Sequence, residues 1–480
     1  MTLKEEILEI LRYTNSIKNN EPLLRSQCEF LEELLSRSDL SEDSGTLLLI
    51  KEALSEYAEK IYSTERMVDV RFQYAISLLY KTSNYTECLI ILSELLKIPN
   101  IEQHPSYLQI LLEMGSVHSI LSKFEEAKLY FQKAEKLSQS NSEDSFRIVA
   151  KQANILHKQQ KHQEAISLLK SLLDSFATIS PNIIAGVCLT LGTIYSKLQN
   201  TEQSFYYFQK ASELRDVNNY EFGVVLNNNL GNLYSRLNDF EQSVLYFEQS
   251  LQFAIKTEKI DLQIGSYVNL ASIEIQRENF KVAQFLLENA SHHIKEIPKS
   301  YITLRVNERL AYVYIHSAED ALLSTAKNMI EQTIKDSIEL QLDDLLASAY
   351  WVYSHYFKRK NLHNEQLDNL IKSYTLSFSR NNLFMEFLTT MEITEYYIQQ
   401  NNIKAKEFLE KAQKSFSQLH KGYQESKIAT LYILNADVAI IENKIEDVRY
   451  FYNKLVSLPI FSNELEIRNK ILKYKTYLQI

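Results

Sequence analysis

The chain has 480 residues, with 52 lysines and arginines against 61 aspartates and glutamates, and its formal net charge is −9 at pH 7. This acidic balance disfavours non-specific binding to nucleic acids and to anionic membrane surfaces. Only 8 glycines and 6 prolines are present, too few for the tight turns of a β-sandwich or for glycine-rich nucleotide-binding loops, so an almost entirely helical fold is predicted.

The first 62 residues show no internal repeat and are predicted to form three helices, with breaks at residues 19–22 and 36–44. Glu5 and Glu6 stand where a secretory signal needs a basic region followed by an unbroken apolar stretch. Nor does the sequence contain a run approaching 18 apolar residues, the length that a membrane span requires. We therefore expect a cytoplasmic protein that opens with a helical segment or cap over residues 1–62.

From residue 63 onward the sequence repeats with a period near 39 residues. The pentapeptide LGTIY, which ends at Tyr195, returns 39 residues later as LGNLY, which ends at Tyr234. In three copies a glycine is followed, sixteen residues later, by a phenylalanine. The pairs are Gly115 with Phe131, Gly192 with Phe208 and Gly231 with Phe247.

Ten repeats follow from carrying this register along the chain. The first marker, a small residue in most copies, falls at Ile76, Gly115, Ala153, Gly192, Gly231, Ala271, Ala311, Ser354, Ile393 and Ala436. The second marker falls at Cys88, Ala127, Ala165, Ser204, Ser243, Ala283, Ala326, Gln366, Ala405 and Val448. The markers are twelve residues apart except between Ala311 and Ala326, where fifteen residues predict a three-residue insertion around residues 316–322. Ile76, Ile393, Gln366 and Val448 depart from the small-residue rule.

This pattern resembles the tetratricopeptide repeat family. The resemblance implies an all-α, right-handed α-α superhelix of about ten helical hairpins over residues 63–460, with the first helix of each pair on the concave side. Residues 461–480 are predicted to form a C-terminal capping helix. Proline placement supports the register, because a proline inside a helix costs about 3 kcal/mol. Five of the six prolines fall between a second helix and the next repeat: Pro99, Pro105, Pro181, Pro298 and Pro459.

Patterns of catalytic or metal-binding residues are missing from the sequence. It contains neither G-x-x-x-x-G-K-[ST], nor G-x-G-x-x-G, nor H-E-x-x-H. Cys28, Cys88 and Cys188 lie far apart, form no C-x-x-C pair and are expected to be buried thiols. Trp351 is predicted to pack in the core rather than to serve as a ligand platform. We expect no enzymatic activity, no cofactor and no metal site.

The resemblance instead implies a ligand groove on the first helices, lined by residues at fixed offsets from the first marker. Asparagine is a poor helix former, so several on one face suggest a carboxamide grip on the backbone of an extended peptide, with arginine and lysine holding carboxylates. Alternatively, these residues only solvate a polar inner surface. The candidates are Arg147, Lys151, Asn154, His157, Lys158, Asn228, Asn229, Asn232, Arg236, Asn269, Arg305, Glu308, Arg309 and Tyr312.

Two functions remain open from the sequence. The first is a non-enzymatic scaffold that binds a protein or peptide in this groove. The second is a bacterial regulator that resembles the Rap-like or RRNPP peptide receptors. In that case a peptide would change the pitch of the superhelix, and residues 1–62 would contact the controlled protein. No helix-turn-helix pattern is evident in residues 1–62, so direct binding of nucleic acid is not expected, and the oligomeric state is not predicted.

Overall fold

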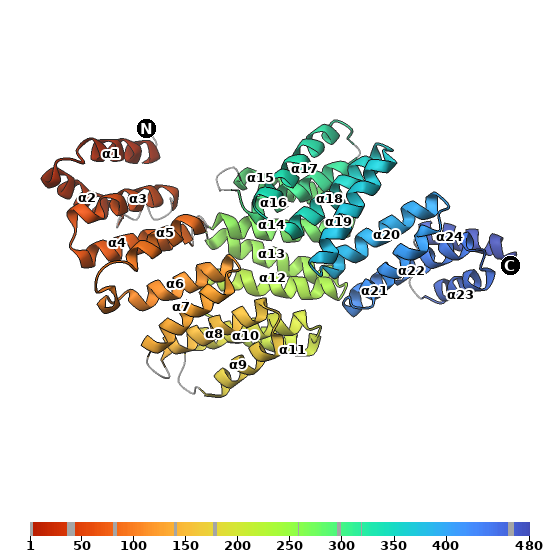
Figure 1. Cartoon of the computed structure of the whole chain (residues 1–480), viewed down its shortest axis with the longest axis horizontal. Coiled ribbons are helices and arrows are strands. Elements are labelled where there is room, and N and C mark those ends of the chain that lie inside the picture. Colours follow the sequence, from red (N-terminus) through yellow and green to blue (C-terminus); the bar gives the residue numbers. More distant parts are fainter. Residues whose placement is uncertain are drawn as a thin grey trace. The chain divides into compact units, whose positions relative to one another are not determined.

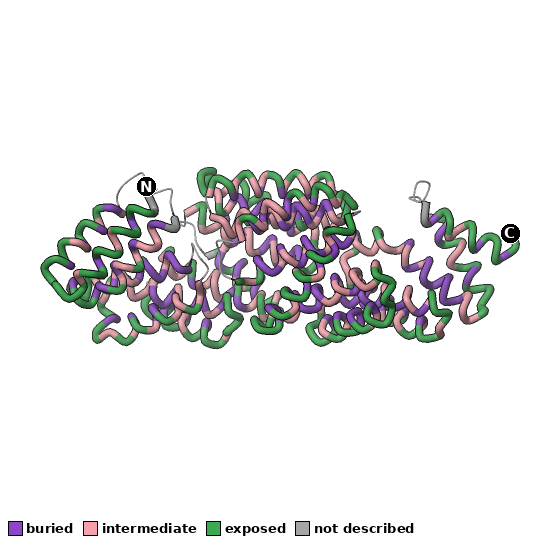
Figure 2. The backbone as a smooth tube through the Cα atoms, turned by 90° about the horizontal axis from the view of Figure 1, so that it is seen from above, coloured by how far each residue is buried: buried purple, intermediate pink, exposed green. Residues whose placement is uncertain are grey.

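The computed structural model describes residues 3–35, 44–79, 84–138, 142–175, 180–257, 259–294, 299–317, 319–458 and 465–480. These residues form 24 α-helices and no β-strand (Figure 1), which confirms the all-α prediction. Buried residues recur along the helices, and the turns between them are mostly exposed (Figure 2). Of the helices in the described ranges, none has both the length and the apolar character needed to cross a membrane.

The chain divides into two compact units, Met1–Asn219 and Tyr220–Ile480, here called unit 1 and unit 2. The helices of unit 1 are α1 (Leu3–Ser16), α2 (Glu21–Leu35), α3 (Ser44–Ile61), α4 (Thr64–Ser77), α5 (Tyr85–Leu95), α6 (Tyr107–Ile120), α7 (Phe124–Leu137), α8 (Glu143–Lys158), α9 (His162–Ser175), α10 (Pro181–Lys197) and α11 (Thr201–Leu214). Those of unit 2 are α12 (Tyr220–Arg236), α13 (Phe240–Thr257), α14 (Ile260–Gln276), α15 (Phe280–His293), α16 (Tyr301–His316), α17 (Leu322–Glu339), α18 (Asp343–Arg359), α19 (His363–Ser379), α20 (Leu383–Gln399), α21 (Lys404–Phe416), α22 (Lys421–Ile441), α23 (Ile445–Val456) and α24 (Leu465–Leu478).

Each repeat forms a pair of packed helices. Unit 1 contains the pairs from α4·α5 to α10·α11, and unit 2 contains those from α12·α13 to α22·α23. The ten predicted hairpins are therefore present in the described chain. Helices α1 to α3 precede them, and α24 packs on α22 and α23. The division into residues 1–62, 63–460 and 461–480 stays a prediction.

The first helices of the hairpins form an inner layer. In unit 1, α6 contacts α8 and α8 contacts α10; in unit 2, contacts between successive first helices run from α12 to α22. Because elements on the inside of a curved stack approach one another most closely, these contacts agree with the predicted position of the first helices.

The glycine markers lie where a phenylalanine crosses the first helix. A Cβ atom added at Gly115, Gly192 or Gly231 would come within 2.5–2.7 Å of the ring of Phe131, Phe208 or Phe247, respectively. The next small residue supports two of these crossings, because the hydroxyls of Ser204 and Ser243 donate to the carbonyls of Gly192 and Gly231 at 2.9 Å. Where the residue sixteen positions after the marker is leucine instead of phenylalanine, the marker can be alanine instead of glycine. Ala271 and Leu287 are such a pair and share one core cluster.

Left-handed turn residues explain why the chain needs so little glycine. In the described chain twelve residues other than glycine have a positive φ while no glycine does, and eight of the twelve lie in the turn inside a hairpin. Six of the twelve are asparagines, the residue that tolerates this conformation best after glycine. Part of the asparagine content of the chain therefore has a backbone origin.

The left-handed turn residue also corrects one repeat marker. It lies seven residues after the marker in most repeats, as Asn238 does after Gly231 and Asn361 after Ser354. In the ninth repeat the turn residue is Asn401, which places the marker at Thr394 instead of the predicted Ile393. Thr394 is small and fully buried, as the marker rule requires.

The insertion and most of the proline positions agree with the sequence predictions. Helix α16 ends at His316 and α17 begins at Leu322, a longer turn than the one between Gln276 and Phe280. Pro99 and Pro105 lie between α5 and α6, and Pro181 is the first residue of α10. Pro298 and Pro459 lie outside the described residues.

Candidate functional site

Helix α8 carries the candidates of unit 1, and its lysines bind the neighbouring first helix. Lys151 Nζ donates to Ser116 Oγ at 2.6 Å, and Lys158 Nζ donates to the carbonyl of Ser119 at 3.1 Å. Burial lowers the pKa of both lysines. Since Ser116 and Ser119 lie on α6, both lysines link two first helices of the inner layer.

The other candidates on α8 differ in exposure. Arg147 and Asn154 are exposed. His157 Nδ1 lies 3.0 Å from Nδ1 of His162 on α9. Burial, followed by the nearby His162 and Lys197, lowers the pKa of His157 to about 4, so this imidazole is neutral at pH 7. The α8 candidates therefore form a polar inner face whose lysines already have partners.

The asparagine candidates of unit 2 lie on α12 and α14. Asn269 Nδ2 donates to Asn228 Oδ1 at 3.0 Å, which links these two first helices. Asn229 Nδ2 donates to the carbonyl of Val225, one turn earlier on its own helix. Asn232 alone among these four is exposed. Three of the four carboxamides therefore have partners within the protein, which is a structural reason for their presence on this face.

Arg236, the last candidate on α12, lies at a contact between distant repeats of unit 2. A Cβ atom added at Gly422, near the start of α22, would come within 2.3 Å of the Arg236 carbonyl and 2.9 Å of Leu237 Cα. Backbone therefore meets backbone here, and glycine is required because any side chain would separate the two segments. This contact, the α12–α22 contact, joins the first and last hairpins of unit 2.

Helix α16 positions a buried carboxylate between two arginines. Glu308 is 0% exposed and accepts hydrogen bonds from Ser348 Oγ at 2.6 Å and from Arg305 Nη1 at 3.2 Å. Its Oε2 also lies 3.5 Å from Arg309 Nε. Burial alone would raise the pKa of Glu308, but the two guanidiniums and the Ser348 hydroxyl outweigh it and hold the pKa below its usual range. Glu308 is thus interior, in place of the exposed position that its offset predicts.

Arg309 has fewer partners than its burial requires. Its side chain is 24% exposed, and its Nε is buried without a hydrogen bond to any described residue. Arg305 and Arg309 share the single carboxylate of Glu308, so this group carries a net positive charge. A guanidinium has five donors in a fixed plane and stays protonated in proteins. Arg309 is therefore a cation that can accept a further anionic partner.

Aromatic rings from α16 and α18 lie beside these arginines. Tyr312 and Trp351 stack with centroids 5.2 Å apart and planes inclined by 14°. The ring centroid of His316 lies 4.1 Å from that of Tyr312, and the ring centroid of His355 lies 4.5 Å from that of Trp351. Burial, followed by the nearby His355, lowers the pKa of His316 to about 4. The four rings make a half-buried aromatic surface on two neighbouring first helices.

Glu392 on α20 completes this arrangement from the third helix. Its Oε1 accepts from Trp351 Nε1 at 2.7 Å and lies 3.2 Å from His355 Nε2, whereas its Oε2 is buried and has no hydrogen bond within the described ranges. Burial alone would raise its pKa, but His355, Lys358 and Trp351 outweigh it and keep the pKa low. We call Arg305, Glu308, Arg309, Tyr312, His316, Ser348, Trp351, His355 and Glu392 the inner cluster.

Five members of the inner cluster were not among the predicted site residues: His316, Ser348, Trp351, His355 and Glu392. The same offsets applied to the repeat at Ser354 would have indicated Ser348, Trp351 and His355. Trp351 does pack against two core clusters, as predicted, but its indole N–H also reaches Glu392. Glu392 was missed because the candidates were drawn only from repeats up to the one at Ala311. Relative to Thr394 it occupies the position that Arg309 occupies relative to Ala311.

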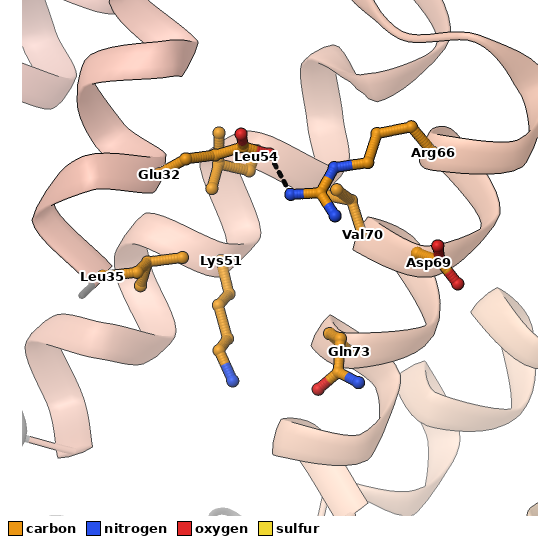
Figure 3. A pocket seen from close by; sticks show the side chains of 8 residues that line it. All are labelled: Glu32, Leu35, Lys51, Leu54, Arg66, Asp69, Val70 and Gln73. Atoms are coloured by element: carbon orange, nitrogen blue, oxygen red, sulfur yellow. Dashed lines mark hydrogen bonds and ion pairs between the residues drawn. The ribbon is translucent and has the colours of Figure 1, made fainter.

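Unit 1 contains a pocket of about 330 Å³ between α2, α3 and α4 (Figure 3). Its charged lining residues already have partners: Arg66 pairs with Glu32 at 2.8 Å, and Lys51 donates to Ser77 at 2.9 Å. None of the residues that line it was a predicted site residue, and no motif in the sequence marks them. Within the described part of the chain, no group of three or more histidine, cysteine, aspartate or glutamate side chains is arranged to hold a metal ion.

Comparison with known proteins identifies the repeats. The sequence matches the tetratricopeptide repeat family at residues 108–141 and 185–256. A search of curated proteins found no match. Among solved structures, the fold is similar to that of a Rap protein complexed with competence and sporulation factor. That match has 12% identity and a TM-score of 0.52, and it covers 76% of this chain and 99% of the other.

Two further structures are similar at lower scores. One is the apo form of RapI, at 14% identity and TM-score 0.48, covering 56% of this chain and 97% of that one. The other is a human IFIT1 dimer with m7Gppp-AAAA, at 15% identity and TM-score 0.44, covering 88% and 96%. At these identities the likeness concerns the fold alone. The two matched segments cover three of the ten hairpins, α6·α7, α10·α11 and α12·α13, and these match the tetratricopeptide repeat in sequence as well as in fold.

Proposed function

We propose that this chain is a non-enzymatic scaffold that binds a protein or peptide along the first helices of unit 2. The observation that carries this proposal is the inner cluster, in which Arg309 Nε and Glu392 Oε2 are buried without hydrogen bonds to described residues and the rings of Tyr312 and Trp351 stack. An uncompensated buried polar group is destabilising, and a bound ligand is one partner that removes this cost. Tetratricopeptide repeats generally serve as interaction scaffolds, which agrees with this role.

Affinity capture with matched variants tests the surface. The full chain would be used as bait beside the double variant Arg309→Gln/Trp351→Ala and the triple variant Asn228→Ala/Asn232→Ala/Arg236→Ala. The control variant Lys372→Met changes an exposed residue of the second helix α19. We expect the control to retain the partner and the double variant to lose it, with circular dichroism showing that each variant is folded. Equal recovery by all baits would overturn the proposal.

The triple variant shows how far the binding surface extends. Because Asn228 and Asn269 already bind each other, its effect is expected to be smaller than that of the double variant. If only the triple variant loses the partner, the surface lies on α12 and α14 rather than on the inner cluster.

A peptide-responsive regulator is the second candidate. Its support is the likeness to the Rap protein, which extends over 99% of that chain. In this candidate a peptide held by unit 2 alters the superhelix, and residues 1–62 contact the controlled protein. Small-angle X-ray scattering of the full chain, with and without a bound peptide, tests it. A radius of gyration that does not change on saturation would argue against a pitch switch.

A further inference from the structure

We infer that the inner cluster recognises a peptide segment in which an aromatic side chain separates a carboxylate from a basic side chain. The carboxylate pairs with Arg309, the aromatic ring stacks on the Tyr312 and Trp351 surface, and the basic group donates to Glu392 Oε2. This inference rests on the proposed function and specifies the chemistry of the ligand at the same surface.

The positive end of the cluster calls for an anion. Arg305 and Arg309 face one carboxylate, Glu308, and only Arg305 makes a hydrogen bond to it. Ser348 Oγ donates to the other oxygen of Glu308, Oε1, at 2.6 Å. Both oxygens of Glu308 therefore already accept a hydrogen bond from a residue other than Arg309. Since 24% of the Arg309 side chain is exposed, a ligand can reach it. A carboxylate fits because its two oxygens match the planar donors of a guanidinium.

The middle of the cluster offers a flat surface to a ring. Tyr312 and Trp351 are nearly parallel, and the hydrogen bond from Trp351 Nε1 to Glu392 fixes the orientation of the indole. Offset stacking of one more ring is favourable beyond the apolar area that it buries. Tyr312 and Trp351 are only half-buried, so their ring surfaces are not fully covered by the protein.

The negative end of the cluster calls for a donor. Glu392 is 16% exposed, and its Oε1 is occupied by Trp351 and His355 while Oε2 has no hydrogen bond from a described residue. An ammonium or guanidinium from the ligand would form a charge-assisted hydrogen bond with Oε2 once the side chain turns to expose this atom. Because Arg309 and Glu392 carry opposite charges, the site requires one acidic and one basic group on the ligand.

The helix spacing limits the length of the ligand. Arg309 lies on α16 and Glu392 on α20, two steps apart in the inner layer. Packed helices lie about 8–10 Å apart, so the two charges are separated by on the order of 10–20 Å. An extended peptide advances about 3.3 Å per residue, so roughly three to six residues separate the acidic group of the ligand from its basic group.

Fluorescence anisotropy with synthetic peptides tests the inference on the full chain. The probes are labelled, end-blocked peptides of serine and alanine carrying one aspartate, one phenylalanine and one lysine, with three to six residues between the charges and in both orders. Further probes replace aspartate by asparagine, phenylalanine by alanine, lysine by glutamine, or aspartate by phosphoserine. We expect at least one three-feature probe to bind, and each neutral replacement to raise its Kd tenfold or more.

Variants of the protein assign each contact. In Arg309→Gln, replacing aspartate by asparagine in the peptide should no longer change the Kd, and in Glu392→Gln the same should hold for lysine and glutamine. Arg309→Lys should restore part of the affinity, since it keeps the charge but not the planar fork. Arg449→Gln is the control, because Arg449 is exposed on α23. It pairs with Glu446 three residues away on its own helix, just as Arg305 pairs with Glu308.

The outcomes separate the inference from the proposed function. Binding that is absent for all probes, or that does not depend on their charges, overturns the inference; the capture experiment with the Arg309→Gln/Trp351→Ala bait still decides the function independently. A phosphoserine probe that binds tenfold tighter than its aspartate counterpart would replace the carboxylate by a phosphate. A response of Arg449→Gln equal to that of Arg309→Gln would show a general charge effect and would also overturn the inference.

Discussion

The inner layers of the two units use charged side chains in different ways. On α8 of unit 1, Lys151 and Lys158 donate to a serine hydroxyl and a serine carbonyl of the preceding first helix. On α16 and α20 of unit 2, Arg309 Nε and Glu392 Oε2 are buried and are not satisfied by described residues. The position two residues before the marker therefore links two helices at Lys151 of unit 1, whereas at Arg309 and Glu392 of unit 2 it holds a polar atom without a hydrogen bond from the described chain.

This difference shows that the chemistry of an inner helix depends on its neighbour in the stack. A lysine that donates to a serine already has a hydrogen-bond partner within the stack. Two arginines that share one glutamate do not both have all their donors paired. By contrast, the crossings inside the hairpins are alike in both units, because Gly192 in unit 1 and Gly231 in unit 2 are both covered by a phenylalanine.

The largest expected effect is the removal of the buried carboxylate from unit 2. Glu308→Leu leaves Arg305 and Arg309 without a counter-charge in the interior, and breaking a buried ion pair in this way costs about 3–5 kcal/mol. The matching change in unit 1, Lys151→Met, breaks one hydrogen bond and should cost about 1 kcal/mol. Urea titrations give the two free energies of unfolding, and hydrogen exchange locates the loss. Equal costs would contradict the contrast between the inner layers.

Alanine at the glycine markers tests the packing that the two units share. Gly192→Ala and Gly231→Ala place a Cβ atom too close to the ring of a buried phenylalanine, so each should cost about 1–3 kcal/mol. Gly186 on α10 and Gly265 on α14 have open space at the Cβ position. Alanine there should stabilise by up to about 1 kcal/mol through its helix propensity. Thermal unfolding measures all four variants, and a destabilised Gly186→Ala would count against this account.

The α12–α22 contact is expected to have a smaller effect on stability. Gly422→Ala forces the start of α22 away from Arg236 and Leu237, at about 1–2 kcal/mol for a contact that can relax. The hairpins themselves should remain intact, so the helical circular dichroism should be unchanged. Hydrogen exchange should rise at the end of α12 and the start of α22. Unchanged exchange at both places would show that the contact does not hold unit 2 together.

Acid titration compares one histidine from each unit. His157 and His316 have a folded pKa of about 4, below the ordinary histidine value of 6.5 that applies to the unfolded chain. As pH falls, the unfolded state takes up these protons first, so the stability is complete above pH 6.5 and is lost between about 6.5 and about 4. His157→Gln and His316→Gln should each lessen the loss in urea midpoint between pH 7 and pH 5. A loss as large as that of the unchanged protein would contradict these assignments.

Much of the fold could be predicted from residue size at fixed spacing. The glycine and phenylalanine pairs revealed the hairpin, and the spacing from Ala311 to Ala326 revealed the insertion. One marker was placed wrongly, at Ile393 instead of Thr394, because Ile393 continued the spacing while the turn at Asn401 was not evident from the sequence.

The candidate site was less predictable, because exposure on the inner layer depends on partners in other repeats. The offset rule placed Glu308 on the surface, but Arg305, Arg309 and Ser348 surround it. The asparagines of α12 and α14 were predicted to bind a ligand, but Asn228 and Asn269 form a hydrogen bond with each other.

The sequence by itself determined the hairpins, their number and their period, because each crossing joins residues only sixteen positions apart and selects them by size. The tertiary structure decided which polar side chains are satisfied. Lys151 is hydrogen-bonded to Ser116, which lies 35 positions away in the sequence. The separations are 40 positions for Glu308 and Ser348 and 41 for Trp351 and Glu392. Such pairs form only when one hairpin stacks on the next, and their chemistry leaves no periodic trace in the sequence.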